Sequence, residues 1–297
     1  MIGRMLKRIF APLAGASLAF GAPAHAQQAV EAAGPALWMV ADEDTTIYLF
    51  GTVHALPQEV DWLDERIITA FDASDELVTE VDLGEPEGMA QELIATAMLP
   101  EGQTLRSLLT PEQTAIYEAA LRQINIPAAM FDQFEPWYAG LIISTAPLFQ
   151  QGYSQDSGVE FVLNQRAGTA KTKDELESTA YQLSLFDSLP MESQIKFMMD
   201  AAEDVDRIKP MLDAMVAEWL EGDAEGLAAL MNEGLTDPLM ADQLLYERNR
   251  NWAKWIGNRM KAPGTVFVAV GAGHLAGDGS VQEELARIGI EATRIYE

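Results

Sequence analysis

The chain has 297 residues, of which 46 are acidic and 19 basic, so its formal net charge at pH 7 is −27. That charge excludes a role built on binding nucleic acid or an anionic membrane surface, because both are bound through positive protein surface. The sequence contains no cysteine, which excludes thiolate metal sites, cysteine nucleophiles and dithiol redox chemistry. The length suits one large domain or two small ones.

The first 26 residues have the features of a secretory signal peptide. Three basic residues precede an apolar stretch from Ile9 to Pro23, and Ala24-His25-Ala26 matches an A-x-A cleavage site. A membrane-spanning helix needs about 18 or more apolar residues, and two prolines shorten this stretch below that length. We therefore expect cleavage after Ala26. The mature protein would be a single domain of residues 27–297, periplasmic or secreted, with no membrane partner.

The segment before residue 87 has the pattern of a small α/β unit. Two β-branched and aromatic runs, Leu37–Val40 and Thr46–Phe50, flank an acidic turn and predict a β-hairpin. Apolar residues at helical spacing between Val60 and Phe71 predict a helix. The next run, Leu77–Asp82, alternates in polarity as a strand does.

The middle of the chain, residues 87–261, is expected to be nearly all helix. Thr110-Pro111-Glu112-Gln113 is a capping box with proline at the first helical position, and Pro136–Phe149 is an apolar helix. The amphipathic stretch Met191–Leu220 is interrupted by Pro210, since proline breaks or kinks a helix interior. Methionine commonly fills gaps in a core, so four residues of this stretch are assigned to the core: Met198, Met199, Met211 and Met215.

The C-terminal flank predicts a strand at Thr265–Val270, a helix at Val281–Ile288 and a final strand at Ala292–Tyr296. Strand, helix and strand in this order form a βαβ unit. The expected fold class is therefore α/β. Its mixed β-sheet is built from the N-terminal and C-terminal flanks, with a long, mostly helical middle region.

Two of the three histidines stand in the same four-residue frame after a predicted strand. The frames are Gly51-Thr52-Val53-His54 and Gly271-Ala272-Gly273-His274. Glycine lets the backbone turn there without steric cost, and open α/β sheets bind ligands at the carboxyl ends of their strands. A single histidine in this place is more often solvated or hydrogen-bonded than a ligand, and a GxxH match is weak by itself. The matched pair indicates one site built from two halves.

A carboxylate would complete the site, because two imidazoles and an acid are a common ligand set for a hydrolytic divalent metal. Glu80 is the acid we choose, since it lies in an otherwise apolar run and an unpaired buried carboxylate is costly. A metal ion or an arginine would remove that cost. The alternative is that Glu80 faces solvent from an edge strand. Asp82 shares its side of the strand and is expected to be solvated.

Five segments have residues and an order that match one known family. They are Phe50–His54, Thr79–Asp82, Leu176–Pro190, Glu247–Trp252 and Val270–Gly279. Together they resemble the TraB/GumN family over the whole mature length. The chain departs from the family pattern at Glu160, where relatives usually have Asp, and at Lys171–Glu175, which replaces a more apolar strand.

This resemblance implies a fold related to the Tiki proteases and the erythromycin esterase/ChaN group. It also implies a metal-dependent peptidase that favours manganese or cobalt, with zinc as an alternative metal. Carried over by position, the paired histidines are His54 and His274, the glutamate is Glu80 and the arginine is Arg248. Family members differ in role, some being tied to peptide-pheromone shutdown and others to polysaccharide operons, so the fold alone does not fix the activity.

The mechanism we expect is metal-assisted hydrolysis of a peptide bond. The two histidines and Glu80 would hold one divalent metal that activates a water molecule and polarises the scissile carbonyl. Arg248 would stabilise the oxyanion or bind a substrate carboxylate, and either Glu160 or Glu177 would act as general base. The alternative for Arg248 is a surface position paired with Glu247.

Two other functions fit parts of the sequence. A non-catalytic protein that sequesters peptides or oligosaccharides could use the same cleft, but it would not need two histidines and a glutamate to converge. Zinc uptake would predict His-rich tracts, which the sequence lacks. The partner we expect is a peptide or protein substrate, with neither nucleic acid nor a membrane. The sequence leaves the oligomeric state open.

Overall fold

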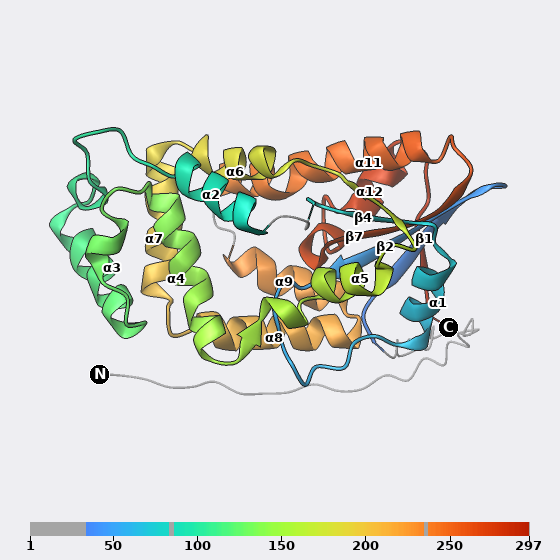
Figure 1. Cartoon of the computed structure of the whole chain (residues 1–297), viewed down its shortest axis with the longest axis horizontal. Coiled ribbons are helices and arrows are strands. Elements are labelled where there is room, and N and C mark those ends of the chain that lie inside the picture. The colour runs from blue at the N-terminus through green and yellow to red at the C-terminus, as the bar shows by residue number, and fades with distance from the viewer. Residues whose placement is uncertain (1–33, 83–85, 235–236, 297) are drawn as a thin grey trace, which may run out of the picture. The chain divides into compact units, whose positions relative to one another are not determined.

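The computed structural model describes residues 34–82, 86–234 and 237–296, so the predicted signal peptide lies outside the described residues. The centre of the fold is a six-stranded mixed sheet with the strand order β6-β4-β7-β2-β1-β8. Figure 1 shows strands of the N-terminal flank beside those of the C-terminal flank, with helices of the middle region extending away from them. This arrangement confirms the expected α/β fold class. The strands are β1 (Leu37–Ala41), β2 (Thr45–Thr52), β4 (Glu76–Thr79), β6 (Thr172–Glu175), β7 (Gly264–Gly271) and β8 (Thr293–Ile295).

The predicted hairpin is present, with β1 and β2 paired antiparallel. Asp42 closes its turn, because Oδ1 of this residue accepts a hydrogen bond of 2.9 Å from the Thr45 N–H. On its other side β1 pairs antiparallel with β8. Strands β7 and β8 are therefore parallel, but β2 and β1 lie between them, so the predicted βαβ unit crosses two intervening strands.

Strand β7 enters the sheet between β2 and β4 and runs parallel to both. It is apolar on both faces, as a central parallel strand must be when each face is covered. Phe267 and Ala269 point into one core cluster, while Val266, Val268 and Val270 point into another. Because β2, β7 and β4 are parallel, their carboxyl ends meet at one edge of the sheet.

Helices cover both faces of this sheet (Figure 1). Helices α1 (Glu65–Ala73), α5 (Val159–Ala167) and α8 (Ile208–Glu221) contribute to the cluster that contains Phe267, and α11 (Glu247–Arg259) and α12 (Val281–Arg287) to the opposite one. Helix α1 begins later than predicted. The Asp64 carboxylate caps it by accepting hydrogen bonds from the N–H groups of Arg66 and Ile67, which leaves Val60 outside the helix.

The middle region is mostly helical, as expected, and several of its helices form a separate core cluster. Thr110 and Gln113 make the predicted capping box. The remaining helices are α2 (Pro86–Thr96), α3 (Pro111–Gln123), α4 (Pro136–Gln150), α6 (Thr179–Asp187), α7 (Met191–Glu203), α9 (Ala224–Gly234) and α10 (Pro238–Ala241), followed by a π-helical turn at Asp242–Tyr246. Short 3-10 turns occupy Leu105–Leu108, Ala128–Phe131, Gln155–Ser157 and Ala272–Leu275, and a small second sheet pairs β3 (Leu56–Pro57) with β5 (Tyr153–Ser154).

The structure differs from the sequence predictions in three details of the middle region. The middle region, predicted to be nearly all helix, also contains an edge strand of the sheet, β6, whose residues are all exposed. The stretch from Met191 breaks at residues 204–207 rather than at Pro210, which lies in the first turn of α8 where a missing N–H costs no hydrogen bond. Met198 and Met199 are buried as predicted, whereas Met211 is 40% exposed, so its assignment to the core is wrong.

Among the described residues, no helix has the length and apolarity needed to cross a membrane.

Candidate functional site

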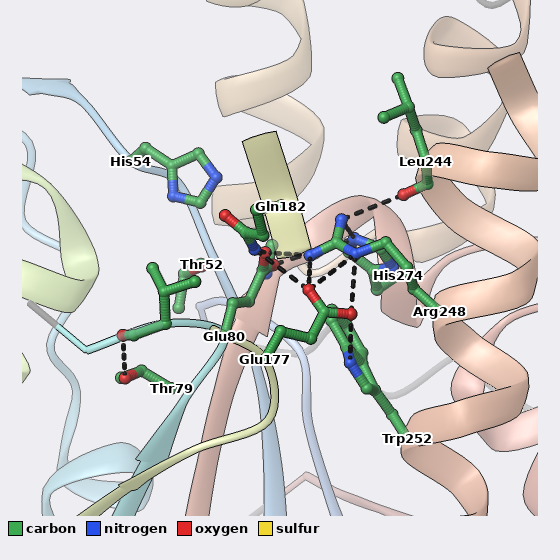
Figure 2. A network of polar contacts seen from close by, with 12 residues as sticks. Thr52, His54, Thr79, Glu80, Glu177, Gln182, Leu244, Arg248, Trp252 and His274 are labelled. Carbon is green, nitrogen blue, oxygen red and sulfur yellow. Dashed lines mark hydrogen bonds and ion pairs between the residues drawn. The ribbon is translucent and has the colours of Figure 1, made fainter. Parts of the chain in front are cut away.

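Three adjacent strands deliver the predicted site residues to one edge of the sheet. Thr52 and Gly271 are neighbours in the register of β2 and β7, so the two GxxH frames leave the sheet side by side. Strand β4 ends at Thr79, earlier than predicted, and Glu80 follows it directly. His54, Glu80 and His274 therefore extend from the ends of β2, β4 and β7 towards a common space (Figure 2).

The glycines of the two frames are required for close packing rather than for an unusual backbone angle. A Cβ on Gly51 would stand 2.9 Å from the Ala272 Cα, so the frames could not lie against each other. A Cβ on Gly271 would stand 3.2 Å from Glu80 Oε1, 3.6 Å from His274 Cδ2 and 3.9 Å from His54 Nε2. All three candidate ligands therefore face the bare backbone at Gly271.

Glu160 holds the first histidine. The Nδ1 atom of His54 lies 2.5 Å from Oε1 of Glu160, and the same oxygen accepts a hydrogen bond of 2.5 Å from the Thr52 hydroxyl. Glu160 is buried near the start of α5, whereas the His54 side chain is 71% exposed. The imidazole thus has one anchored nitrogen and an exposed ring.

His274 is held from both sides in the interior. Its Nδ1 lies 2.6 Å from Oδ1 of Asn249, and its Nε2 lies 3.0 Å from Nη1 of Arg248. The ring also packs against the indole of Trp252, with ring centroids 4.3 Å apart. His274 is 5% exposed, so these contacts fix its orientation.

Arg248 joins the acids of the site into one buried network (Figure 2). Its Nη2 donates to Glu80 Oε2 at 2.5 Å and to Glu177 Oε2 at 2.9 Å, and its Nε donates to both oxygens of Glu177 at 3.0 Å. Its Nη1 donates to the Leu244 carbonyl and lies against His274. Since a guanidinium has five N–H groups, these contacts use its full donor capacity.

Glu80 and Glu177 have further hydrogen-bond donors that hold them in place. The Gly271 N–H donates to Glu80 Oε1 at 2.7 Å, and the Gln182 amide donates to both acids. Nε1 of Trp252 donates to Glu177 Oε1 at 2.8 Å. Both carboxylates are buried, and Arg248 forms an ion pair with each of them, as buried charges require partners.

The surrounding charges shift the pKa values of the two histidines in opposite directions. The Glu160 carboxylate raises the pKa of His54 to about 9. Burial, with the positive charge of Arg248 added, outweighs the attraction of Glu80 and lowers the pKa of His274 to about 3. Burial disfavours ionisation of Glu80, but the charges of His274 and Arg248 overcome it and lower its pKa to about 2. At neutral pH His274 is therefore neutral and Glu80 ionised.

The site contains residue types that bind a divalent metal, two imidazoles and a carboxylate. Both imidazoles are held at Nδ1, and Glu80 Oε1 lies 3.8 Å from Nε2 of His274, but in this arrangement that Nε2 accepts a hydrogen bond from Arg248 Nη1. Within the described residues, no three His, Asp or Glu side chains stand as a group that could hold a metal ion. A metal ion that binds His274 Nε2 would therefore have to displace Arg248 Nη1, which lies 3.0 Å from this nitrogen.

All six residues proposed from the sequence as ligands or catalytic groups lie around this edge of the sheet: His54, Glu80, Glu160, Glu177, Arg248 and His274. Arg248 is buried and bonded to Glu80 and Glu177, so the alternative of a surface pair with Glu247 is wrong. Glu80 is likewise buried rather than on an exposed edge. Asp82 is exposed, as expected.

Sequence reasoning did not single out Asn249, Trp252, Gln182 or Thr52 as site residues. Asn249 and Trp252 are the first and fourth residues after Arg248 on α11, and both are buried. Because Asn249 and Trp252 lie close to Arg248 on the same predicted helix, their spacing could have indicated that they belong to the site. Their contacts depend on how α11 packs against the end of β7, which no local pattern specifies.

Comparison with known proteins agrees with the resemblance seen in the motifs. The TraB/PrgY/gumN family pattern matches residues 36–294. The chain is 22% identical over 252 residues to the uncharacterized protein YbaP of Escherichia coli (strain K12), covering 84% of this chain and 92% of that protein. It is 23% identical over 264 residues to an uncharacterized protein of Treponema pallidum (strain Nichols), covering 82% and 78%. No solved structure shows a significant match. The family match extends over most of the chain, which therefore belongs to the TraB/PrgY/gumN family.

Proposed function

We propose that this protein is an exported, metal-dependent hydrolase that cleaves peptide bonds. The observation that carries the proposal is the convergence of the two imidazole rings and the Glu80 carboxylate on the bare backbone at Gly271. A site that only bound a peptide would have no need of this donor set. The signal-like N-terminus supports export, and the negative charge of the chain is consistent with a substrate other than nucleic acid.

His54, His274 and Glu80 would hold the metal, with manganese or cobalt expected from the family resemblance and zinc as an alternative. When bound, such a metal supplies Lewis-acid polarisation of a carbonyl and an activated water. Glu80 contributes negative charge in a buried place, and His274 is neutral at neutral pH, so a metal at its Nε2 would take the place of the N–H of Arg248. His54 lies at the exposed side of the site, where a substrate would enter.

The contacts of Arg248 change the role that we propose for it. Because all its donors are engaged inside the network, it serves first to pair with and orient Glu80 and Glu177. Glu177 accepts hydrogen bonds on both oxygens, and Glu160 faces His54 and Thr52. These contacts favour positioning roles for both acids, and we assign neither as general base.

The test is metal content together with peptide cleavage. The purified protein would be stripped with a chelator and loaded with Mn²⁺, Co²⁺ or Zn²⁺. Bound metal would be measured by elemental analysis, and cleavage of a peptide library by mass spectrometry. We expect bound metal and metal-dependent cleavage, with both lost in His54→Ala and His274→Ala. Glu175→Gln, at an exposed position of β6, is the matched control and should keep both. Peptide binding without cleavage under any metal would favour a sequestering protein instead.

A further inference from the structure

Two polar side chains hold the two imidazoles by the same ring nitrogen. We propose that Glu160 and Asn249 are positioning residues, each accepting the Nδ1–H of one histidine and so fixing the orientation of its ring. The metal-binding meaning of this arrangement rests on the proposed function. The ring orientation does not, because it follows from protein contacts alone.

The orientation of Asn249 is fixed by a third group. Its Nδ2 donates to the Gly279 carbonyl at 2.8 Å, which leaves Oδ1 to face His274 Nδ1 at 2.6 Å. An amide oxygen only accepts, so Nδ1 of His274 must carry the proton. Arg248 only donates, so the lone pair of Nε2 faces Nη1 at 3.0 Å. The contacts on both sides of the ring therefore require the same tautomer.

Glu160 is held against His54 by the way α5 begins. The Val159 N–H donates to the Val53 carbonyl at 3.0 Å, and a Cβ on Gly158 would stand 2.1 Å from the His54 carbonyl oxygen. The start of α5 is thus packed on the backbone of the first GxxH frame. This places the buried Glu160 carboxylate at Nδ1 of His54, on the side of the ring away from Nε2.

The two elements come from unrelated parts of the fold, α5 and α11, yet they make equivalent contacts. Metal-binding histidines are usually oriented by such an acceptor at the other ring nitrogen, and loss of the acceptor typically costs about 10–100-fold in metal affinity. Neither residue needs to touch the substrate. Their effect would be transmitted through the histidine rings.

Ring orientation can be measured by NMR with ¹⁵N-labelled histidine in the metal-free protein, because the sequence has only three histidines and one of them, His25, lies in the predicted signal peptide. We expect two Nδ1–H protons shielded from exchange, one from His54 and one from His274. The His54 signal should disappear in Glu160→Ala, and the His274 signal in Asn249→Ala. Glu160→Gln and Asn249→Asp each keep an acceptor oxygen, so they should retain the signals.

A second readout is the affinity for Mn²⁺ or Zn²⁺ alone, measured by titration calorimetry. The alanine variants should bind about 10–100-fold more weakly, and the conservative variants should stay closer to the parent. Trp219→Phe is the matched structural control, because it removes a buried hydrogen bond of 2.9 Å to the Gly51 carbonyl and leaves the acceptors of both imidazoles, Glu160 and Asn249, unchanged. It should lower the melting temperature and keep both signals.

The inference would be overturned if the parent protein lacked the two protected protons, or if they survived in the folded alanine variants. Equal loss of affinity in Asn249→Ala and Asn249→Asp would also contradict it, since that pattern points to the bond with Gly279. If the alanine variants fail to fold, the parent spectrum and the conservative variants still decide. A parent that shows both protons but binds no metal would contradict the proposed function and leave the positioning roles in place.

Discussion

Arg248 shows how much one buried side chain contributes to the site. It bridges two carboxylates and a neutral imidazole from different parts of the chain, and it is 7% exposed. Lysine has the same charge but only three donors and no planar fork, so it could not satisfy Glu80 and Glu177 together. The residue is therefore decisive for stability as well as for the site.

The first prediction is that Arg248→Lys destabilises the protein by about 1.5–3 kcal/mol for each charged hydrogen bond that is not replaced. Urea unfolding of the metal-free protein measures this loss. Arg250→Lys on the same helix is the control, because the pair of Arg250 with Asp242 is solvent-exposed and such pairs contribute about 0–1 kcal/mol. Similar effects from both variants would contradict the central role of Arg248.

The second prediction concerns pH. The pKa of Glu80 is lowered to about 2, so the stability it contributes is present above its usual pKa and is lost as the pH falls towards 2. The pKa of His274 is lowered to about 3, so protonation of the unfolded chain below about pH 6.5 also favours unfolding. The urea midpoint of the metal-free protein should therefore fall steadily from about pH 6.5 to pH 3.

At alkaline pH, the stability of the metal-free protein should fall as the pH rises. The pKa of His54 is raised to about 9, so its contribution is present below about pH 6.5 and is lost as the pH rises to 9. His54→Ala should flatten the alkaline limb of the profile and leave the acid limb in place. The decrease in the urea midpoint at acid pH is assigned to Glu80 and His274. If this decrease were unchanged in a Glu80→Gln, His274→Ala double variant, that assignment would be wrong.

At the scale of elements, the two GxxH frames act as packing surfaces for each other. The backbone of the second frame lies where a Cβ on Gly51 would be, whereas the nearest obstacle at Gly271 is the end of the Glu80 side chain. A backbone cannot yield as a side chain can. The two glycines of the motif therefore have different tolerances although their frames look alike in sequence.

The third prediction is that Gly51→Ala destabilises the protein more than Gly271→Ala does. Overpacking typically costs about 1–3 kcal/mol, and we expect Gly51→Ala at the upper end. Gly271→Ala should instead weaken metal binding, because it pushes Glu80 away from the shared space. Gly234→Ala is the control, since nothing lies within 4 Å of its Cβ position. Thermal unfolding and metal titration of the three variants test this order.

At the scale of the whole molecule, the site is built from residues of both the N-terminal and the C-terminal flank. β2 and β4 come from the N-terminal flank and β7 from the C-terminal flank, and the long helical middle lies between them in sequence. A ligand that contacts the ends of all three strands would bind the folded state and not the unfolded one. Such a ligand must raise the free energy of unfolding.

The fourth prediction is that saturating Mn²⁺ or Co²⁺ stabilises the protein, by about 2.7 kcal/mol when the free metal is 100 times the dissociation constant. Differential scanning fluorimetry across a metal series measures the shift. His274→Ala should remove it, whereas Glu175→Gln, at an exposed residue of β6, should keep it. A shift of the same size in His274→Ala would show that the metal binds elsewhere, for instance to acidic surface.

Local sequence patterns were enough to predict the available side-chain chemistry and the type of each long element. The hairpin, the capping box at Thr110 and the helix from Pro136 depend on local patterns and are present in the structure. The pairing of His54 with His274 could be proposed because both frames follow apolar strands, whose periodicity is a strong local signal. The ends of two elements differ from the sequence prediction. Helix α1 begins after the cap at Asp64, and β4 ends at Thr79, and both ends depend on single contacts.

Which strands are neighbours, and what each polar side chain contacts, depends on long-range packing and could not be predicted from local patterns. Insertion of β7 between β2 and β4 brings the three strand ends together, and this order depends on long-range pairing that no local window contains. The same holds for Arg248, for which the sequence left a surface pair with Glu247 as the alternative to a place in the site. It is buried because α11 packs across the end of β7 next to Glu80 and Glu177. A buried charge is stabilised only by partners that the whole fold supplies.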